Sequence, residues 1–316
     1  MKKIGLLLIL GLSVAAYAQS TADVAPTANT SPTAASFPFE RIQAPTNADL
    51  YCAGFISQTH QPDANYVAGG LNTPNTTRFV NGDLLYLSGT GYQLDKEYTI
   101  LREIVDPNEH EAFVGQSKLI KSVGQPYAEL ARVKIVDTRN KMAIAQVEFS
   151  CDPIVPGDVA VPFVEKPTVS FHLPVRFDRF APANAKTAGR ILMAKDFDTE
   201  LGTGMKVYLN VGTNQGVKTG DYFRAVRGYE ADRHNEVDSL SFKASTTEDT
   251  QKVSPSMDPN FLTRTKGPTI HVADMPRRSV GEVVVLSTTP TTATGMIVFA
   301  LEDVHVGDNV ELDEQQ

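Results

Sequence analysis

Short runs of apolar residues recur along this chain, and several of them alternate with polar residues or contain valine and isoleucine. Glycine, proline, asparagine and aspartate bound these runs, and these residues favour tight turns. The clearest runs are LLYLSG at 84–89, ARVKIV at 131–136, AIAQVEF at 143–149, KVYLNV at 206–211, EVVVL at 282–286 and TGMIVFAL at 294–301. The pattern predicts β-strands that are joined by turns.

A helical period is hard to find in the same sequence. The best helix candidate runs from Gly124 to Ile135, but its β-branched residues favour a strand instead. The expected fold class is therefore all-β, and small barrels or sandwiches are the expected architecture.

The second half of the chain repeats the first half in the same order. The matched segments are 84–87 with 206–209, 98–102 with 223–227, 131–138 with 281–288, 145–149 with 295–299, and 157–158 with 307–308. Upstream, Phe39–Ala48 resembles Phe177–Ala185, and Ala53-Gly54 falls on Ala188-Gly189. Matches that keep one order over such a length predict a tandem duplication.

The duplication sets the expected domain organisation. Copy one covers 37–163, a linker covers 164–173, and copy two covers 174–316, so each copy is large enough for one small core. If Asp106-Pro-Asn corresponds to Asp258-Pro-Asn, copy two carries a polar insertion at about 228–254. Copy one has its own extra stretch at 58–77. Long insertions of this kind are either function-bearing loops or disordered surface.

The N-terminus predicts export. Residues 1–18 combine two lysines, an apolar run and an Ala-Tyr-Ala cleavage site, as in a secretory signal peptide; an uncleaved membrane anchor is the alternative. Residues 19–36 are rich in Ala, Thr, Ser and Pro, which predicts a flexible tether or simply a disordered N-terminus. No later stretch is apolar over the ~18 residues that a membrane span needs.

The chain contains two cysteines, Cys52 and Cys151. In an oxidising compartment a single structural disulfide is the expected state. Such a bridge would close a long loop, for which the chain-entropy model gives ~4–5 kcal/mol. A redox-active or metal-binding pair is the alternative, but such cysteines usually lie close together in sequence.

The formal net charge of −8 becomes more negative when a leader with Lys2 and Lys3 is removed. This charge opposes binding to nucleic acid and to anionic lipid surfaces, because both are negatively charged. No basic tract compensates for it.

The same Gly-Asp pair recurs at equivalent places in the two copies. Gly157-Asp158 and Gly307-Asp308 stand just before strands at equivalent places. Glycine can adopt positive φ and aspartate can hydrogen-bond the turn beside it, so we interpret all four as turn residues. A ligand-binding carboxylate is the alternative.

Catalytic, cofactor and metal sites are not predicted. The six histidines form no zinc-binding motif, and Gly-x-Ser-x-Gly and phosphate-binding loops are absent from the sequence. The acidic stretch Asp196–Gly202 resembles a calcium loop but lacks its spacing, so a solvated turn is preferred. The chain has no Trp, and its equivalent Tyr86 and Tyr208 lie within apolar strands, which favours the core over a sugar platform.

Turn glycines and an arginine recur in one order in both copies. Copy two shows this order in Ala188-Gly-Arg-Ile, Gly216-Val-Lys-Thr-Gly-Asp-Tyr-Phe and Val306-Gly-Asp-Asn-Val. It resembles small β domains of bacterial envelope proteins, such as the C-terminal domain of flagellar assembly protein T and the β domains that accompany LysM modules. The resemblance implies an envelope scaffold or adaptor and brings no catalytic residues.

The expected function is that of a non-enzymatic, exported interaction or scaffold protein of the cell envelope, periplasmic or extracellular. Its loops or strand edges would bind an envelope protein or a cell-wall polymer. Two alternatives stay open. One is a module that binds peptidoglycan or another polysaccharide, and the other is a secreted hydrolase with a site between the domains.

Overall fold

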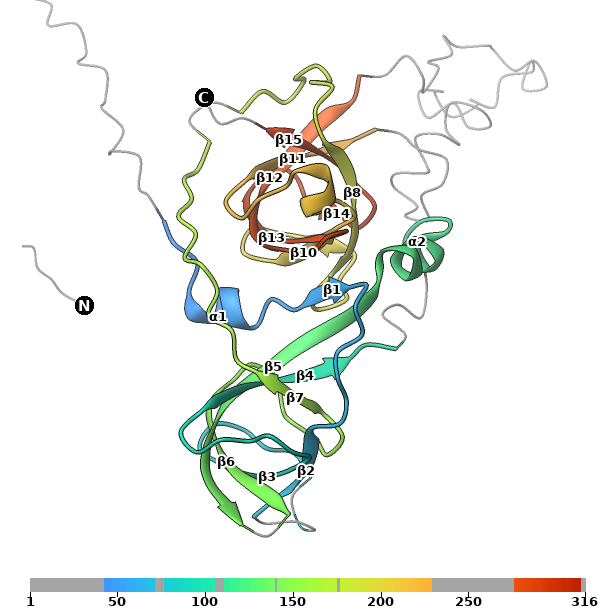
Figure 1. The fold of residues 1–316 in the computed structure, drawn as a ribbon. Helices are drawn as coiled ribbons and strands as arrows, with labels where there is room; N and C mark the ends of the chain where they lie inside the picture. Colours follow the sequence, from blue (N-terminus) through green and yellow to red (C-terminus); the bar gives the residue numbers. More distant parts are fainter. Residues whose placement is uncertain are drawn as a thin grey trace, which may run out of the picture. The chain divides into compact units, whose positions relative to one another are not determined.

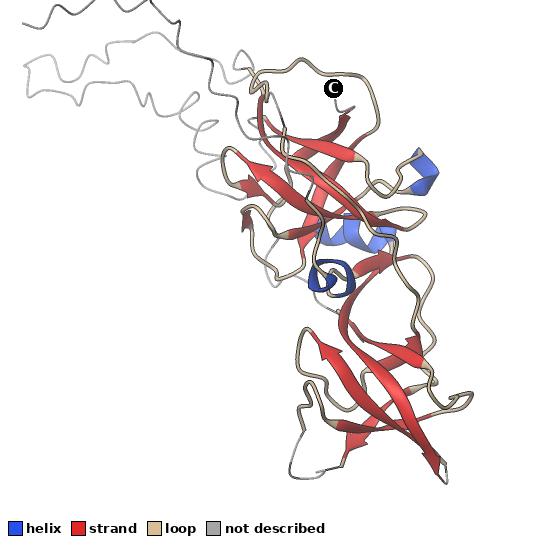
Figure 2. Ribbon diagram, turned by 90° about the vertical axis from the view of Figure 1, so that its left-hand side faces the viewer, coloured by secondary structure: helices blue, strands red, loops and turns tan. Residues whose placement is uncertain are grey.

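The computed structural model describes residues 43–71, 75, 77–105, 111–139, 141–174, 177–228 and 276–313. All of these residues belong to one compact unit, Glu40–Gln316. Strands predominate in the described chain, as Figure 2 shows. The expected signal peptide, the tether and residues 229–254 of the expected insertion lie outside the described residues.

Six strands of the first copy close into a barrel (Figure 1). Their order is β5-β4-β7-β2-β3-β6, and β6 also pairs with β5. The short strand β1 adds to the start of β5. The bounds are β1 Phe55–Ser57, β2 Tyr66–Gly70, β3 Leu84–Ser88, β4 Glu97–Glu103, β5 Gln125–Arg139, β6 Met142–Ser150 and β7 Val159–Pro162.

Six strands of the second copy form another closed barrel, in the order β10-β13-β12-β11-β15-β8. Strands β9 and β14 form a separate two-stranded sheet. The bounds are β8 Ala188–Ala194, β9 Glu200–Leu201, β10 Lys206–Leu209, β11 Tyr222–Arg227, β12 Arg278–Thr288, β13 Ala293–Ala300, β14 Val304–His305 and β15 Asn309–Asp313. Because both barrels close, each of their strands pairs on both sides. A partner can therefore contact the loops and the outer faces of the barrels, but not a free strand edge.

The two barrels share strand order and register, so the predicted pair of tandem all-β domains is confirmed. Ala131 pairs with Ser150 in the first barrel, and Gly281 pairs with Ala300 in the second. The β-bulges also coincide, for example between residues 135 and 137 and between residues 285 and 287. Such agreement makes every residue of one barrel strand comparable with a residue of the other.

The upstream part of the sequence alignment is wrong. Arg190 pairs with Asn309 as Tyr66 pairs with Val159, so β8 is the counterpart of β2. Gly54 instead precedes β1, outside the six strands that close the first barrel. An Ala-Gly pair is too short to identify a strand, because strand and turn segments of β proteins contain many such pairs.

Helices are few and short in the described chain: α1 (Asn47–Tyr51), α2 (Gln116–Val123) and the 3-10 turn η1 (Thr213–Gln215). Thr46 caps the N-terminus of α1, and its side chain accepts from the Asp49 N–H in a capping box. The helix candidate at 124–135 lies in β5, immediately after α2. Gly124, with a φ of +142°, ends α2, and the β-branched residues beyond it continue as strand.

The second barrel is buried on both faces of several strands, whereas the first is buried mainly inside. Four apolar side chains from other segments, Leu50, Ala53, Val169 and Phe171, pack on the outside of β12 and β13. The outer positions that they cover are Val284, Leu286, Met296 and Val298. The equivalent outer positions of the first barrel are Lys134, Val136, Gln146 and Glu148, which are at least partly exposed. This difference explains why EVVVL is apolar throughout and ARVKIV alternates.

Candidate functional site

An arginine–aspartate pair organises the turn before the last strand of the first barrel. Arg102, near the end of β4, donates to the Asp158 carboxylate from Nε at 2.8 Å and from Nη2 at 2.7 Å. The same carboxylate accepts the Val155 N–H at 2.7 Å. The hydrogen bonds that Arg102 donates to Asp158 raise the pKa of Arg102. The carboxylate is 3% exposed, so its charge is neutralised in place by this pair and the turn.

The second barrel repeats this arrangement. Arg227 donates to Asp308 at 3.0 and 2.8 Å, and the carboxylate accepts the His305 N–H at 2.7 Å. Here both side chains are buried, with Asp308 at 0% and Arg227 at 5% exposure. In both copies an arginine and a buried aspartate therefore stabilise the turn before the last strand of the barrel.

The four residues of the Gly-Asp pairs lie at these turns. Gly157 has a φ of +98° and Gly307 a φ of +94°, values that favour glycine. The aspartates accept backbone N–H groups of their own turns, as turn chemistry requires. Sequence reasoning missed the arginine partners. The signal was present, because both matched segments, YTILR and FRAVR, end in arginine.

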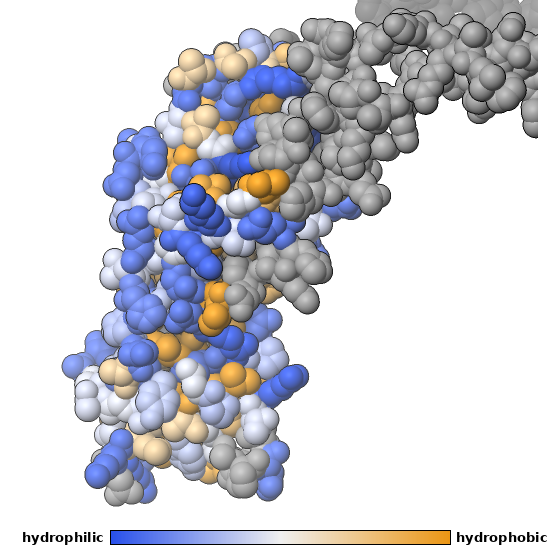
Figure 3. Space-filling view, turned by 90° about the vertical axis from the view of Figure 1, so that its right-hand side faces the viewer, coloured by the Kyte–Doolittle hydropathy of each residue, from blue (hydrophilic) through white to orange (hydrophobic). Residues whose placement is uncertain are grey.

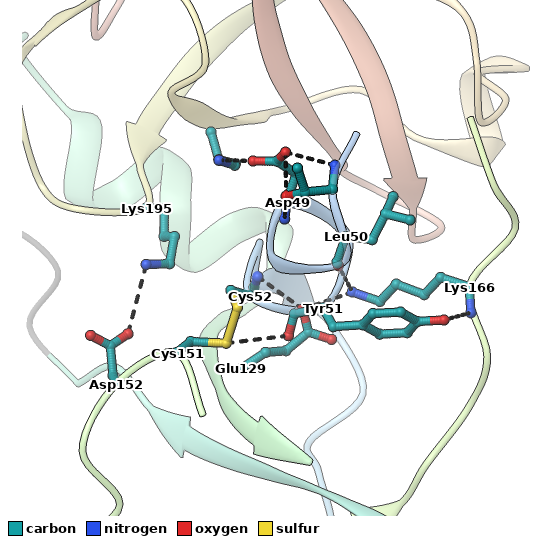
Figure 4. The surroundings of a disulfide bond; sticks show 12 residues. Asp49, Leu50, Tyr51, Cys52, Glu129, Cys151, Asp152, Lys166 and Lys195 are labelled. Carbon is teal, nitrogen blue, oxygen red and sulfur yellow. Dashed lines mark hydrogen bonds and ion pairs between the residues drawn. A yellow bond between two sulfur atoms is a disulfide. The ribbon is translucent and has the colours of Figure 1, made fainter. Parts of the chain in front are cut away.

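The predicted disulfide is confirmed, and it joins α1 to the first barrel (Figure 4). Cys52 caps the C-terminus of α1 and Cys151 follows β6, with 99 positions between them in sequence and a Cα–Cα distance of 5.7 Å. Helix α1 itself packs on the second barrel through Leu50. The bridge thus ties a segment that covers the second barrel to the first barrel.

A buried ion pair reinforces the same junction (Figure 4). Lys166, in the linker between the barrels, donates from Nζ to Glu129 Oε2 and to the Leu50 carbonyl oxygen, each at 2.7 Å. Glu129 also accepts the Gly54 N–H at 3.0 Å. Burial raises the pKa of Glu129, while the Lys166 ammonium opposes that shift. The pair therefore links the linker, β5 and the α1–β1 segment.

Side chains of the second barrel satisfy the backbone of the α1–β1 segment. The Tyr208 hydroxyl donates to the Ala53 carbonyl oxygen at 2.7 Å, and the Thr294 hydroxyl donates to the Gly54 carbonyl oxygen at 3.0 Å. Gly54 has a φ of +70°, and a Cβ there would lie 2.4 Å from the Tyr208 hydroxyl oxygen. A larger residue at position 54 would therefore separate the segment from the barrel.

The connection between β4 and β5 also packs on the second barrel. Phe113 belongs to the interior cluster of that barrel and is 1% exposed. Its ring lies against Gly307, where a Cβ would be 2.7 Å from Cδ1, and the Arg190 guanidinium carbon is 3.9 Å from the ring centroid. Gln116 of α2 donates to the Leu192 carbonyl oxygen at 2.7 Å. The second barrel thus has a docking face for a segment of the first copy.

The equivalent face of the first barrel is open. Register places Tyr66 where the second barrel has Arg190, and Gly157 where it has Gly307. Tyr66 is 40% exposed, and a Cβ at Gly157 would meet nothing within 4 Å. Exposed and partly exposed residues of β2, β3, β6 and the turn before β7 share this outer face. We name the set the Tyr66 face, and its residues are Tyr66, Ala68, Tyr86, Ile144 and Gly157.

Hydrophobic side chains are dispersed on the side of the molecule that Figure 3 shows. Hydrophilic residues predominate among the coloured residues there, and hydrophobic ones form small separate groups.

The three described histidines, His60, His172 and His305, have different neighbours. His60 Nδ1 lies 3.0 Å from the Tyr127 hydroxyl, and His305 lies in β14, while His110, His234 and His271 are outside the described residues. Within the described ranges, no three His, Cys, Asp or Glu side chains are placed to hold a metal ion. The acidic stretch at 196–202 includes strand β9, which pairs with β14.

Glu282 is a buried carboxyl group that sequence reasoning missed. It lies on β12 opposite Arg224 of β11, and its Oε2 has no hydrogen-bond partner. Arg224 forms an ion pair with Asp313. Burial and the Asp313 carboxylate raise the pKa of Glu282 to about 7, against the opposing effect of Arg224 and His172. The only sequence signal was a single acidic residue in the apolar run GEVVVL.

No protein-family model matches the chain, and no curated protein matches its sequence. None of the helices in the described ranges is long and apolar enough to cross a bilayer. The resemblance to β domains of envelope proteins stays a prediction.

Proposed function

We propose that this protein is a non-enzymatic, exported interaction or scaffold protein of the bacterial cell envelope. One observation carries the proposal: charged pairs, each with a buried carboxylate, hold the chain's own elements together. Arg102 and Arg227 bind the turns of their barrels, and Lys166 binds Glu129 at the junction. Because these charges bind other elements of the same chain, they support a rigid scaffold whose loops and outer faces can bind a partner.

Two further features support export and display. A disulfide such as Cys52–Cys151 persists in oxidising compartments outside the cytoplasm, which agrees with the predicted signal peptide. The outer strand positions of the first barrel, among them Lys134 and Glu148, stay solvated, whereas those of the second barrel are covered. The first barrel is therefore the better candidate for contact with an envelope protein or a cell-wall polymer.

The test is made in cells and with purified material. We expect photo-crosslinkers on the first barrel to capture a defined envelope protein in intact cells, and the mature chain 19–316 to stay in solution when mixed with peptidoglycan sacculi. A matched chain that lacks residues 229–254 serves as the control. Saturable pelleting with sacculi would instead make the protein a polysaccharide-binding module. Turnover of a cell-wall substrate by the purified chain would overturn the non-enzymatic assignment.

A further inference from the structure

The segment that follows the first barrel lies across the outside of the second. We name residues 169–174 the strap, and their apolar side chains pack on the outer positions of β12 and β13. Hydrogen bonds fix the strap in place. The Gln43 N–H donates to the Phe171 carbonyl oxygen at 2.7 Å, and the Phe171 N–H donates to the Gln43 carbonyl oxygen at 2.8 Å. The His172 N–H donates to the Tyr222 hydroxyl at 3.1 Å.

A buried carboxyl group lies on the face that the strap covers. Glu282 precedes Val284 by two positions on the outside of β12, and it pairs with Arg224 of β11 and with Phe299 of β13. It is 6% exposed, and within the described chain its Oε2 has no hydrogen-bond partner. A carboxylate that is buried without a donor costs free energy, and the protonated group avoids most of that cost. Ionisation of Glu282 therefore opposes the covered state.

The equivalent charge of the first barrel is partly solvated. Arg132 has the register position of Glu282, because it pairs with Phe149 as Glu282 pairs with Phe299. Its side chain is 35% exposed and lies within ion-pair distance of two glutamates. A charge at this strand position is compatible with the barrel when solvent reaches it. Burial is what distinguishes Glu282.

Charged groups from three elements act on Glu282. Burial has the largest effect and raises the pKa of Glu282 to about 7, and the Asp313 carboxylate of β15 adds to this shift. Arg224 of β11 and His172 of the strap oppose it, although Arg224 is itself paired with Asp313. The other charged side chains of β11, β12 and β15 have different partners: Arg227 pairs with Asp308, Arg278 with Glu302 and Glu311 with Arg277.

We propose that the strap is a pH-dependent latch on the second barrel, held closed while Glu282 carries a proton and released more often once Glu282 is ionised. The sign follows from the raised pKa. The closed state holds the proton more tightly than a state in which solvent reaches Glu282. The open population should therefore rise as the pH increases from about 4.5 to about 7, and it should change little outside this window.

The latch controls access to an apolar surface. When the strap leaves, Val169 and Phe171 no longer cover the outer positions of β12 and β13. Contiguous apolar side chains that become exposed in this way form a surface to which a partner can bind. The availability of this surface would then depend on the pH of the surroundings. The latch is independent of the proposed envelope function, because it is measured on purified protein.

The experiment is amide hydrogen exchange of the mature chain 19–316 between pH 5 and pH 8, with rates corrected for the intrinsic effect of pH. The N–H groups of Phe171 and His172 are the reporters, because they donate to Gln43 and Tyr222 in the closed state. We expect their protection in the wild type to fall by roughly tenfold or more over this range.

Two variants test whether Glu282 is the group that titrates. Glu282→Gln cannot ionise, so its strap should keep at pH 8 the protection that it has at pH 5. Glu148→Gln is the matched control, because it removes a carboxyl group of the first barrel that is 35% exposed. It should respond to pH like the wild type. Wild-type protection that is constant over the range, or a loss that persists in Glu282→Gln, overturns the proposal. Circular dichroism verifies that both variants are folded.

Low concentrations of urea separate release of the strap from unfolding of the barrel. Release exposes little surface, so exchange at Phe171 and His172 should not respond to roughly 1 M urea, whereas exchange through global unfolding accelerates. The Val285 N–H, which donates to the Asp221 carbonyl oxygen at 2.8 Å, reports on the barrel itself. Strap amides that follow Val285 in urea would show that ionisation unfolds the barrel, and this result would also overturn the proposal.

Discussion

The Tyr208 hydroxyl donates a 2.7 Å hydrogen bond to the carbonyl oxygen of Ala53, a residue that lies more than 150 positions earlier in the chain. Tyr86 occupies the same register position in the first barrel and is partly exposed. The two tyrosines stand in similar strands, LLYL and KVYL. Their environments differ because the α1–β1 segment lies against Tyr208, whereas Tyr86 is partly exposed.

Replacement of Tyr208 by phenylalanine should lower the free energy of unfolding by about 1–3 kcal/mol, because the buried Ala53 carbonyl loses its donor. The matched change Tyr86→Phe should cost less than about 0.5 kcal/mol, as surface substitutions usually do. Urea denaturation of both variants measures the difference. Equal losses of unfolding free energy in the two variants would show that the burial of Tyr208 under the α1–β1 segment does not strengthen its hydrogen bond.

Loss of the Arg227 side chain should be more costly than loss of Arg102. Arg227→Ala leaves Asp308 charged and fully buried, which costs about 3–5 kcal/mol. Arg102 is 38% exposed, so water can replace part of its contact and Arg102→Ala should cost about 1–2 kcal/mol. Denaturant titration gives both values. Adding Asp308→Asn to Arg227→Ala should restore part of the loss, and no recovery would argue against an uncompensated charge.

Removal of the disulfide should destabilise the folded chain. We expect Cys52→Ser with Cys151→Ser to lower the free energy of unfolding by about 2–5 kcal/mol, because the unfolded chain regains the freedom of a long loop. Dithiothreitol should shift the melting temperature of the wild type in the same direction and leave the double variant unchanged. A wild-type melting temperature that ignores the reductant would contradict this prediction.

Glu282 should make stability depend on pH. Its pKa is raised from 4.5 to about 7 in the folded chain, so the folded state holds the proton more tightly than the unfolded state does. The stabilisation is present below about pH 4.5 and is lost as the pH rises towards 7.

The matched variant isolates this effect. At pH 8 the Glu282→Gln variant should be more stable than the wild type, because it has no buried carboxylate. The expected gain is roughly 2 kcal/mol, which is less than the full pKa shift would give, since solvent reaches part of the side chain. The gain should vanish at pH 4. Thermal unfolding from pH 4 to 8 measures both curves. Parallel curves for wild type and variant would mean that Glu282 does not titrate in this range.

Phe113 should stabilise the second barrel although it belongs to the first copy. Phe113→Ala removes a buried ring and should cost about 3–5 kcal/mol. Phe180→Ala, at an exposed position, should stay within about 0.5 kcal/mol of the wild type. Hydrogen exchange should accelerate in α2 in the first variant only. Unchanged protection of α2 would show that the ring does not hold the connection in place.

Local sequence determined the class of fold and its duplication. Strand runs, turn glycines and the order of matched segments are local properties, and they survive in the register of the two barrels from Ala131 and Gly281 onward. The disulfide also followed from the sequence, since the two cysteines of the chain leave one pairing. The roles of Gly157 and Gly307 as turn residues follow from backbone freedom, which is local too.

Only the tertiary structure decided which surfaces are covered. The pairing of Arg227 with Asp308, the buried carboxyl group of Glu282 and the insertion of Phe113 beside Gly307 all join residues that are far apart in sequence. Burial and electrostatic partners depend on distances between elements, and no local pattern encodes those distances. Two barrels built on one register could therefore differ, with one docking face filled and its equivalent, the Tyr66 face, open.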